Sequence, residues 1–315
     1  QRAIELLFEA GLPTTALAFL PGSGNQLGAV FCQDARLAGV CFTGSTQTAR
    51  QINQRLADKP GVIARLVAET GGQNAMIVDS TALTEPVVQD VLASAFTSAG
   101  QRCSALRVLY LQEEVADNIL RLLSGALQEL SLGPSCLRET DVGPVIDRAA
   151  QQRLLQHIEL FQQQGRLLAQ APLPKGLLET GYFVQPSVLQ LAHLSELSEE
   201  HFGPILHVRR YPAQQLAEVL EEINSSGFGL TLGVHSRNQQ TADFIEQRAK
   251  VGNLYVNRNQ IGAAVGVQPF GGQGLSGTGP KAGGPNYLFS FITERVTTTN
   301  TAAIGGNASL LSLQG

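Results

Sequence analysis

The chain has 315 residues, 43% of them hydrophobic and 15% charged, which describes a globular protein with room for two domains and excludes a disordered one. Its formal net charge is −4 and its basic residues form no block, so the sequence shows no electrostatic footprint for nucleic acid. It contains no apolar run long enough to predict a membrane span, and its four cysteines lack the CxxC spacing of zinc sites, so we expect no metal and a reducing, cytoplasmic setting.

The first eighty residues alternate between helices and strands. The chain starts without methionine or a signal-peptide pattern and already reads as part of a helix, so we expect an upstream portion to be missing. We predict helices at 3–10, 25–31 and 47–56, and strands at 16–20, 37–42, 62–68 and 75–79. This alternation predicts a parallel sheet with helices on both faces.

The rest of the chain continues the α/β pattern and then becomes rich in glycine. We predict helices at 83–99, 115–130, 147–164, 213–223 and 238–250, and strands at 106–111, 181–189, 205–209, 230–235, 252–257 and 287–297. The glycine-dense stretch 262–284 indicates a close approach of the backbone to a ligand or to another segment. Small residues dominate the tail 298–315.

The first candidate for chemistry is Cys103, in the turn Gly100-Gln101-Arg102-Cys103-Ser104 between a predicted helix and a predicted strand. A cysteine attacks as its thiolate, which positive or dipolar surroundings favour. The alternative is a cysteine that only fills the core. Two other turns, Gly22-Ser23-Gly24 and Thr43-Gly44-Ser45, end strands and open helices, where backbone N–H groups suit a phosphate. Turn geometry alone also explains their glycines.

Five short motifs, taken together and in this order, resemble those of the aldehyde dehydrogenase superfamily. They are Phe42-Thr43-Gly44-Ser45, Glu69-Thr70-Gly71-Gly72, Gly100-Gln101-Arg102-Cys103, Glu200-His201-Phe202-Gly203-Pro204 and Pro269-Phe270-Gly271-Gly272. The resemblance implies an α/β aldehyde dehydrogenase fold with part of a Rossmann-like NAD-binding domain at 1–71 and a catalytic cysteine domain at 72–275. It also implies a C-terminal return segment and oligomerisation tail at 276–315.

Other segments are similar to the glutamate-semialdehyde (1-pyrroline-5-carboxylate) dehydrogenases within that superfamily. These are Cys103-Ser104, the run from Gly262 to Gly272 and the run from Ser276 to Pro285. The tail from Ile304 to Leu311 resembles the bacterial bifunctional proline utilization A flavoenzymes, in which this module follows an FAD-containing proline dehydrogenase module. The implied activity is NAD-dependent oxidation of L-glutamate γ-semialdehyde to L-glutamate, the second step of proline catabolism.

The resemblance also implies a role for each matching residue. Cys103 would attack the aldehyde and Glu69 would activate the water that releases the product. Gly44 and Ser45 would bind the cofactor pyrophosphate, Glu200 the nicotinamide ribose, and Phe202 would pack beside the nicotinamide. Ser104, Gly262 and Ala263 would anchor the substrate carboxylate through a hydroxyl and backbone N–H groups. The family's oxyanion asparagine and its first cofactor-binding units would lie upstream, so we expect these residues alone to be nearly inactive.

Three alternatives remain at this stage. The chain could be an aldehyde dehydrogenase for another small aldehyde, or an inactive module that serves structure or oligomerisation. It could also be a cysteine acyl-transfer enzyme, although its five histidines form no recognised pairing motif. The expected partners are the small-molecule substrate, further copies of the chain and the proline dehydrogenase module of the same parent chain, with no nucleic acid or membrane contact.

Overall fold

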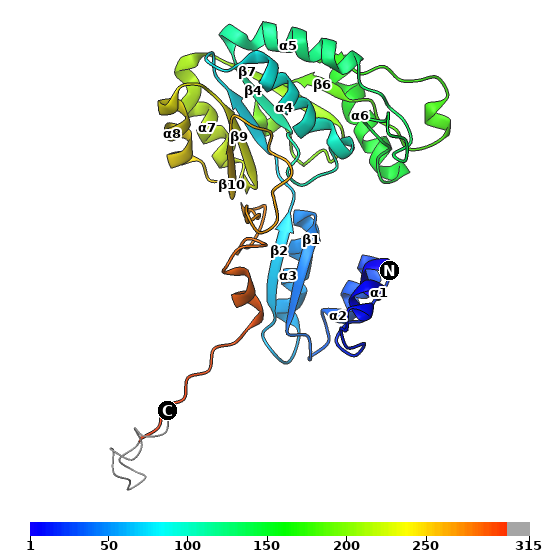
Figure 1. Ribbon diagram of the computed structural model, residues 1–315, viewed down its shortest axis with the longest axis vertical. Helices are drawn as coiled ribbons and strands as arrows, with labels where there is room; N and C mark the ends of the chain where they lie inside the picture. The colour runs from blue at the N-terminus through cyan, green and yellow to red at the C-terminus, as the bar shows by residue number, and fades with distance from the viewer. Residues whose placement is uncertain (301–315) are drawn as a thin grey trace.

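The computed structural model describes residues 1–300, which contain a two-stranded parallel sheet and a seven-stranded, mainly parallel sheet, one above the other in Figure 1, and a further short antiparallel pair. The smaller sheet consists of two parallel strands, with Gly39 opposite Arg65. The elements of this part are the helices α1 (Arg2–Glu9), α2 (Gly24–Phe31) and α3 (Thr46–Asp58) and the strands β1 (Gly39–Gly44) and β2 (Arg65–Thr70). Helix α3 connects the two strands, as parallel pairing requires a crossover.

The larger sheet has seven strands in the order β10-β9-β3-β4-β7-β6-β5. All neighbours are parallel except the edge strand β5, which runs antiparallel to β6. The strands are β3 (Ala75–Val78), β4 (Val108–Gln112), β5 (Leu167–Gln170), β6 (Ser187–Gln190), β7 (Ile205–Tyr211), β9 (Thr231–His235) and β10 (Asn253–Val256). The helices are α4 (Thr84–Phe96), α5 (Glu113–Gln128), α6 (Arg148–Gln163), α7 (Leu216–Ser225) and α8 (Gln239–Arg248). A short antiparallel pair joins β8 (Phe228–Gly229) to β11 (Gln273–Gly274).

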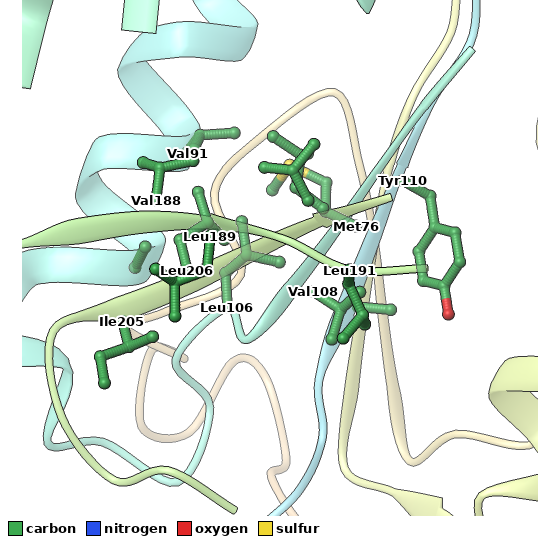
Figure 2. Packing of buried hydrophobic residues seen from close by; sticks show 14 of the residues in the cluster. Met76, Val91, Leu106, Val108, Tyr110, Val188, Leu189, Leu191, Ile205 and Leu206 are labelled. Atoms are coloured by element: carbon green, nitrogen blue, oxygen red, sulfur yellow. The ribbon is translucent and has the colours of Figure 1, made fainter. Parts of the chain in front are cut away.

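The hydrophobic core lies around this larger sheet. Every residue of β3 and of β4 is buried, because a parallel sheet covered on both faces has no solvent side and selects continuous apolar runs. Figure 2 shows side chains of β4, β6, β7 and α4 packed together, among them Val108, Leu189, Leu206 and Val91. The helices show the matching periodicity: α5 buries Ala116, Ile119, Leu123 and Leu127.

The chain crosses between the two sheets twice, and both crossings matter for the site. Residues 71–74 lead from the end of β2 to the start of β3. The glycine-rich segment then returns to β2: the backbone N–H of Thr70 donates to Ser276 O at 3.0 Å, and that of Thr278 donates to Ala68 O at 2.9 Å. Glu69 and Gly277 form an isolated antiparallel bridge between these hydrogen bonds. The glycine-dense stretch therefore approaches another segment closely, as predicted.

Two predicted strands are wrong. Residues 16–20 form no strand, since Phe19 and Leu20 are exposed and no neighbouring strand supplies hydrogen bonds. Residues 287–297 begin with a 3₁₀ turn, η5 (Tyr287–Phe291), and form no strand thereafter. Strand pairing depends on a neighbour, which an apolar sequence run does not specify.

Three further boundaries differ from the prediction. Helix α4 ends at Phe96 rather than 99, because Ser98 and Ala99 have φ values of 58° and 53°. They lie in a short 3₁₀ segment, η1 (Thr97–Gly100). The predicted strand at 181–189 is reduced to β6, and β5 was missed because it is a short strand at the edge. Single 3₁₀ turns occur at η2 (Leu177–Glu179), η3 (Leu194–Glu196) and η4 (Ala213–Gln215).

Two expectations concern the ends and the surroundings of the chain. The tail motif from Ile304 to Leu311 lies outside the described residues, as does most of the predicted tail 298–315. Within residues 1–300, none of the helices combines the length and apolarity needed to cross a membrane.

Candidate active site

A cleft of about 1230 Å³ lies where the two sheets meet. Its walls come from the ends of β1 and β2, the start of α3, the cysteine turn and the loop before β7. The predicted site residues on these walls are Gly44, Ser45, Glu69, Cys103, Glu200 and Phe202. Residues from four separate parts of the sequence thus face one cavity.

Cys103 sits in a turn that is held from behind by Asn74. The Asn74 side-chain amide donates to Cys103 O at 2.6 Å and to Ala105 O at 2.9 Å. The thiol is free and half-buried. Burial raises its pKa, the charge of Glu200 raises it further, and the backbone N–H groups of Ser104 and Cys103 oppose that rise. The resting sulfur is therefore a protonated thiol in a fixed position, with N–H groups aimed at it.

Glu69 lies near the end of β2, inside a cradle formed by the returning glycine segment. Its Oε2 accepts a hydrogen bond from the Gly272 N–H at 2.9 Å, while its Oε1 is buried and has no partner among residues 1–300. A Cβ at Gly271 or at Gly277 would lie 2.8 or 2.9 Å from Oε1, so only glycine fits there. Burial raises the pKa of Glu69 to about 7, against the opposing effects of the Gly272 N–H and Lys281. Near neutral pH this carboxyl exchanges a proton readily.

Glu200 is also buried, but it is paired with Arg107. Arg107 Nη2 lies 2.9 Å from Glu200 Oε1, and the two side chains are 2% and 15% exposed. Burial raises the pKa of Glu200, and the neighbouring guanidinium lowers it. A Cβ on Gly71 would overlap Glu200 Oε2, so the motif glycine after Glu69 leaves room for this second carboxylate. The prediction missed Arg107; its signal was a charged residue in the apolar run 106–111.

Phe202 projects from the same loop, and histidines fill the space behind it. Its ring is 44% exposed and lies 5.3 Å from the Arg107 guanidinium carbon. The rings of His157 and His201 stack with centroids 3.6 Å apart, and His157 Nε2 lies 2.8 Å from His207 Nε2. Burial lowers the pKa of His157 and of His201 to about 4. These histidines bond to one another, which disfavours the acyl-transfer alternative that needs an imidazole on the thiol.

Gly44 and Ser45 form the junction between β1 and α3. Ser45 caps the helix, accepting a hydrogen bond at Oγ from the Thr48 N–H at 3.2 Å. A Cβ on Gly44 would overlap the Phe42 ring, so a side chain is not tolerated at the strand end. Gly44, Ser45 and the first residues of α3 line the cleft, where the dipole of a helix start favours an anion such as phosphate. The other glycine turn, Gly22-Ser23-Gly24, does not line the cleft.

The structure does not bring Ser104, Gly262 and Ala263 into the cleft wall. Ser104 is 7% exposed, and its carbonyl accepts from Thr231 Oγ1 at 3.3 Å and from Gln260 Nε2 at 3.4 Å. Gln260 is fully buried and leads directly to Gly262, where φ is +73°. The loop with Gly262 and Ala263 is therefore tied to the back of the cysteine turn, and its role in substrate binding stays a prediction.

Comparison with known proteins agrees with this geometry. The sequence profile of the aldehyde dehydrogenase family matches residues 1–297. The bifunctional protein PutA of Salmonella typhimurium is 52% identical over 301 residues, which cover 93% of this chain and 23% of that protein. The 1-pyrroline-5-carboxylate dehydrogenase of Geobacillus thermodenitrificans is 38% identical over 289 residues, 90% of this chain and 55% of that protein.

Solved structures show the same relationship. The Bradyrhizobium japonicum proline utilization A mutant D779Y has a TM-score of 0.91 and 54% identity, covering 96% of this chain and 31% of that one. A 1-pyrroline-5-carboxylate dehydrogenase from Thermus, solved with bound NAD, has a TM-score of 0.86 and 36% identity, covering 92% and 56%.

The chain spans about a quarter of the length of its bifunctional relatives and about half that of the shorter ones. The predicted family resemblance and the predicted α/β aldehyde dehydrogenase fold are confirmed. With a profile match over nearly all of its residues, the chain belongs to the aldehyde dehydrogenase family.

Proposed function

We propose that this chain is a dehydrogenase module that oxidises L-glutamate γ-semialdehyde, formed from 1-pyrroline-5-carboxylate, to L-glutamate with NAD. The observation that carries the proposal is the cleft that contains the Cys103 thiol together with Glu69, a carboxyl whose pKa is about 7. A nucleophile and a base of this strength are what oxidation of an aldehyde through a covalent acyl-enzyme requires. The names and identities of the relatives support the choice of substrate.

The cleft suits a nicotinamide dinucleotide in size and in chemistry. Its volume of about 1230 Å³ exceeds the roughly 300–1000 Å³ of ordinary small-molecule pockets. The N–H groups at Gly44 and Ser45 would hold the pyrophosphate, the Glu200 carboxylate would accept from ribose hydroxyls, and Phe202 would pack beside the nicotinamide. When bound, the dinucleotide supplies the hydride acceptor.

Cys103 carries the covalent chemistry in this proposal. Its Sγ loses a proton and bonds to the aldehyde carbon, and the N–H groups of Cys103 and Ser104 stabilise negative charge beside the sulfur. Once hydride has left the thiohemiacetal carbon, a thioester remains on Sγ. Glu69 then takes a proton from water, and the hydroxide attacks the acyl carbon. As the C–S bond breaks, the proton of the new carboxylic acid passes to Sγ, so that the carboxylate product leaves and the Cys103 thiol is restored, while Glu69 releases its proton to solvent.

The remaining assignments belong to the same proposal. Residues 1–71 would form the last part of the cofactor domain, 72–275 the catalytic domain, and 276–315 a return segment used in assembly of several copies. Ser104, Gly262 and Ala263 would bind the α-carboxylate of the substrate from behind the cysteine turn. In a longer bifunctional polypeptide of the cytoplasm, an FAD-dependent proline dehydrogenase module would supply the substrate precursor.

Reaction of the full natural polypeptide with glutamate semialdehyde and NAD tests this function. We expect the wild type to form NADH steadily and Cys103→Ala to form none. Glu69→Gln should complete one rapid turnover and then stop, with an acyl adduct on Cys103 that intact-protein mass spectrometry detects. Cys136→Ala, which removes an exposed cysteine outside the cleft, is the matched control and should behave as the wild type. NADH formation that survives in Cys103→Ala would refute the proposal.

A further inference from the structure

Arg107 is a charged side chain in one of the most buried places of the molecule. It directly precedes β4, between the fully buried Leu106 and Val108, and is itself 2% exposed. A guanidinium in such a place is tolerated only when its five N–H donors find partners. The question is therefore which groups those donors hold.

The partners of Arg107 come from two different loops. In the cysteine turn, Nη1 donates to Gly100 O at 2.8 Å and Nη2 donates to Arg102 O at 3.1 Å. In the loop before β7, Nη1 donates to Gly203 O at 3.1 Å, and both Nη2 and Nε donate to Glu200 Oε1, at 2.9 and 3.2 Å. One guanidinium thus joins the turn of the nucleophile to the loop of Glu200.

The base of this side chain is fixed as well. The Arg107 N–H donates to Asn74 O at 2.9 Å, and Arg107 O accepts from the His207 N–H at 2.8 Å. Arg107 O also lies 3.2 Å from His207 Nδ1; a carbonyl only accepts, so His207 carries its proton on Nδ1 and accepts at Nε2 from His157. The backbone of Arg107 is therefore anchored to Asn74, the residue before β3, and to β7.

The two loops also touch directly at their glycines. Gly100 has φ +65°, and a Cβ there would overlap Gly203 O. Neither loop has room to shift toward the other, and both accept hydrogen bonds from the same guanidinium. Arg107 donates both to Glu200 and to the carbonyls of Gly100 and Arg102. A displacement of Glu200 is consequently transmitted to these two carbonyls, which lie on either side of Gln101, two residues before Cys103.

We propose that Arg107 is a positioning residue that mechanically couples the Glu200 loop to the Cys103 turn, so that a group bound at Glu200 fixes the nucleophile. The roles of Glu200 and Cys103 in this statement rest on the proposed function. Arg107 itself is not among the residues that line the cleft. A lysine in its place would keep the charge but, as a compact ammonium, would not span both loops.

Hydrogen exchange of backbone amides tests the coupling without substrate or dinucleotide. Glu200→Gln should speed exchange in the segment 98–104 on the order of tenfold, although the Glu200 side chain accepts hydrogen bonds from Arg107, which lies outside that segment. The matched control is Glu196→Gln, because Glu196 pairs with an arginine, Arg166, as Glu200 does with Arg107. Like Arg107, Arg166 donates to a backbone carbonyl, Gln190 O, and its guanidinium lies over a phenylalanine ring, Phe161. Glu196→Gln should leave exchange at 98–104 unchanged. In both variants the amides of β3 and β4, which exchange through global unfolding, should remain far slower than those of 98–104, so that the change at 98–104 reports local opening.

Steady-state kinetics of the full natural polypeptide provides the second readout. Arg107→Lys should lower kcat about 10²-fold and raise KM for NAD, with each protein assayed well below its own melting temperature. Arg166→Lys, which changes the same kinds of contact outside the cleft, should keep both parameters within about twofold. A purely structural role for Arg107 would lower Tm without this change in kcat.

The outcomes separate this proposal from the proposed function. Unchanged exchange at 98–104 in Glu200→Gln, or equal kinetics of Arg107→Lys and Arg166→Lys, would overturn the coupling even if the wild type oxidises the semialdehyde. Absence of NADH formation by the wild type would overturn the function instead. Faster exchange at 98–104 in Glu200→Gln would still support the coupling of the two loops in that case.

Discussion

Glu69 and Glu200 are two buried carboxyls of the same cleft with opposite surroundings. Burial raises the pKa of both. Glu69 has one N–H donor, from Gly272, and one oxygen without a partner among residues 1–300. Glu200 has the full charge of Arg107 beside it. Glu69 can therefore exchange its proton near neutral pH, whereas Arg107 holds the Glu200 carboxyl in place and opposes the rise of its pKa that burial causes.

The neighbouring glycines show how the same residue type serves both arrangements. Gly271 and Gly277 lie so close to Oε1 of Glu69 that a Cβ on either would stand 2.8 or 2.9 Å from it. Gly71 instead leaves space for Glu200, whose carboxylate would collide with any side chain at position 71. The two carboxyls therefore differ in role: Glu69 is the group suited to proton transfer, and Glu200 is the one held in a fixed position.

The largest expected effect that separates them is on turnover. Glu69→Gln removes the group that accepts a proton from water, so kcat should fall about 10²- to 10⁴-fold. The residual rate should lose the ionisation near pH 7 that the pKa of Glu69 sets for the wild type. A pH profile of kcat from 5.5 to 9 in the full natural polypeptide measures this. An unchanged ionisation in Glu69→Gln would assign it to another group.

The next largest effect is a loss of folding stability, which we expect for the substitution of Glu200 and not for that of Glu69. Glu200→Gln leaves the 2%-exposed Arg107 guanidinium without its counter-charge, which should lower the free energy of unfolding by about 3 kcal/mol. Urea unfolding at pH 7 measures the loss. Glu218→Gln on the exposed face of α7 is the control and should change stability little. A neutral result for Glu200→Gln would show that the three carbonyl partners of Arg107 suffice.

Glu69→Gln should change the free energy of unfolding in the opposite direction from Glu200→Gln, and the size of the change should depend on pH. Because the pKa of folded Glu69 is about 7 and the ordinary pKa of a glutamate is 4.5, its stabilising contribution is complete below pH 4.5 and is lost as the pH rises through 7. Glu69→Gln should therefore stabilise the fold at pH 8 relative to pH 5, on the order of 1 kcal/mol after allowing for partial exposure. Urea unfolding at the two pH values measures this difference, and equal values would contradict the raised pKa.

The smallest effect concerns the histidines behind the Glu200 loop. The pKa of His157 is lowered from 6.5 to about 4, chiefly by burial, so the unfolded chain binds more protons than the folded one between these values. Stability should fall as the pH falls from about 6.5 to about 4. His157→Gln should remove part of that slope, about 1 kcal/mol across the window, in unfolding measured at pH 7 and 4.5. His193→Gln, on an exposed turn, should leave the slope unchanged.

Local patterns in the chain were enough to place most elements of the larger sheet. The apolar runs that became β3, β4 and β7 were recognisable because both faces of a parallel strand are buried, so burial alone shapes the sequence. The runs at 16–20 and 287–297 look alike locally but form no strand, since neither has a strand beside it in the described residues. Edge strand β5 was missed for the opposite reason: it pairs with β6, but none of its four residues is buried, so its sequence lacks the apolar run of an inner strand.

For the site, too, some features could be read from the sequence and others depended on the tertiary structure. By itself the sequence determined the family and the motif residues Cys103, Glu69 and Glu200, because these residues lie in short motifs that can be read from neighbouring positions in the chain. Only the tertiary structure decided that Glu69 is wrapped by Gly271 and that Arg107 pairs with Glu200, 93 residues away. Contacts between distant segments depend on which loops the fold brings together, and such contacts set the pKa of each carboxyl.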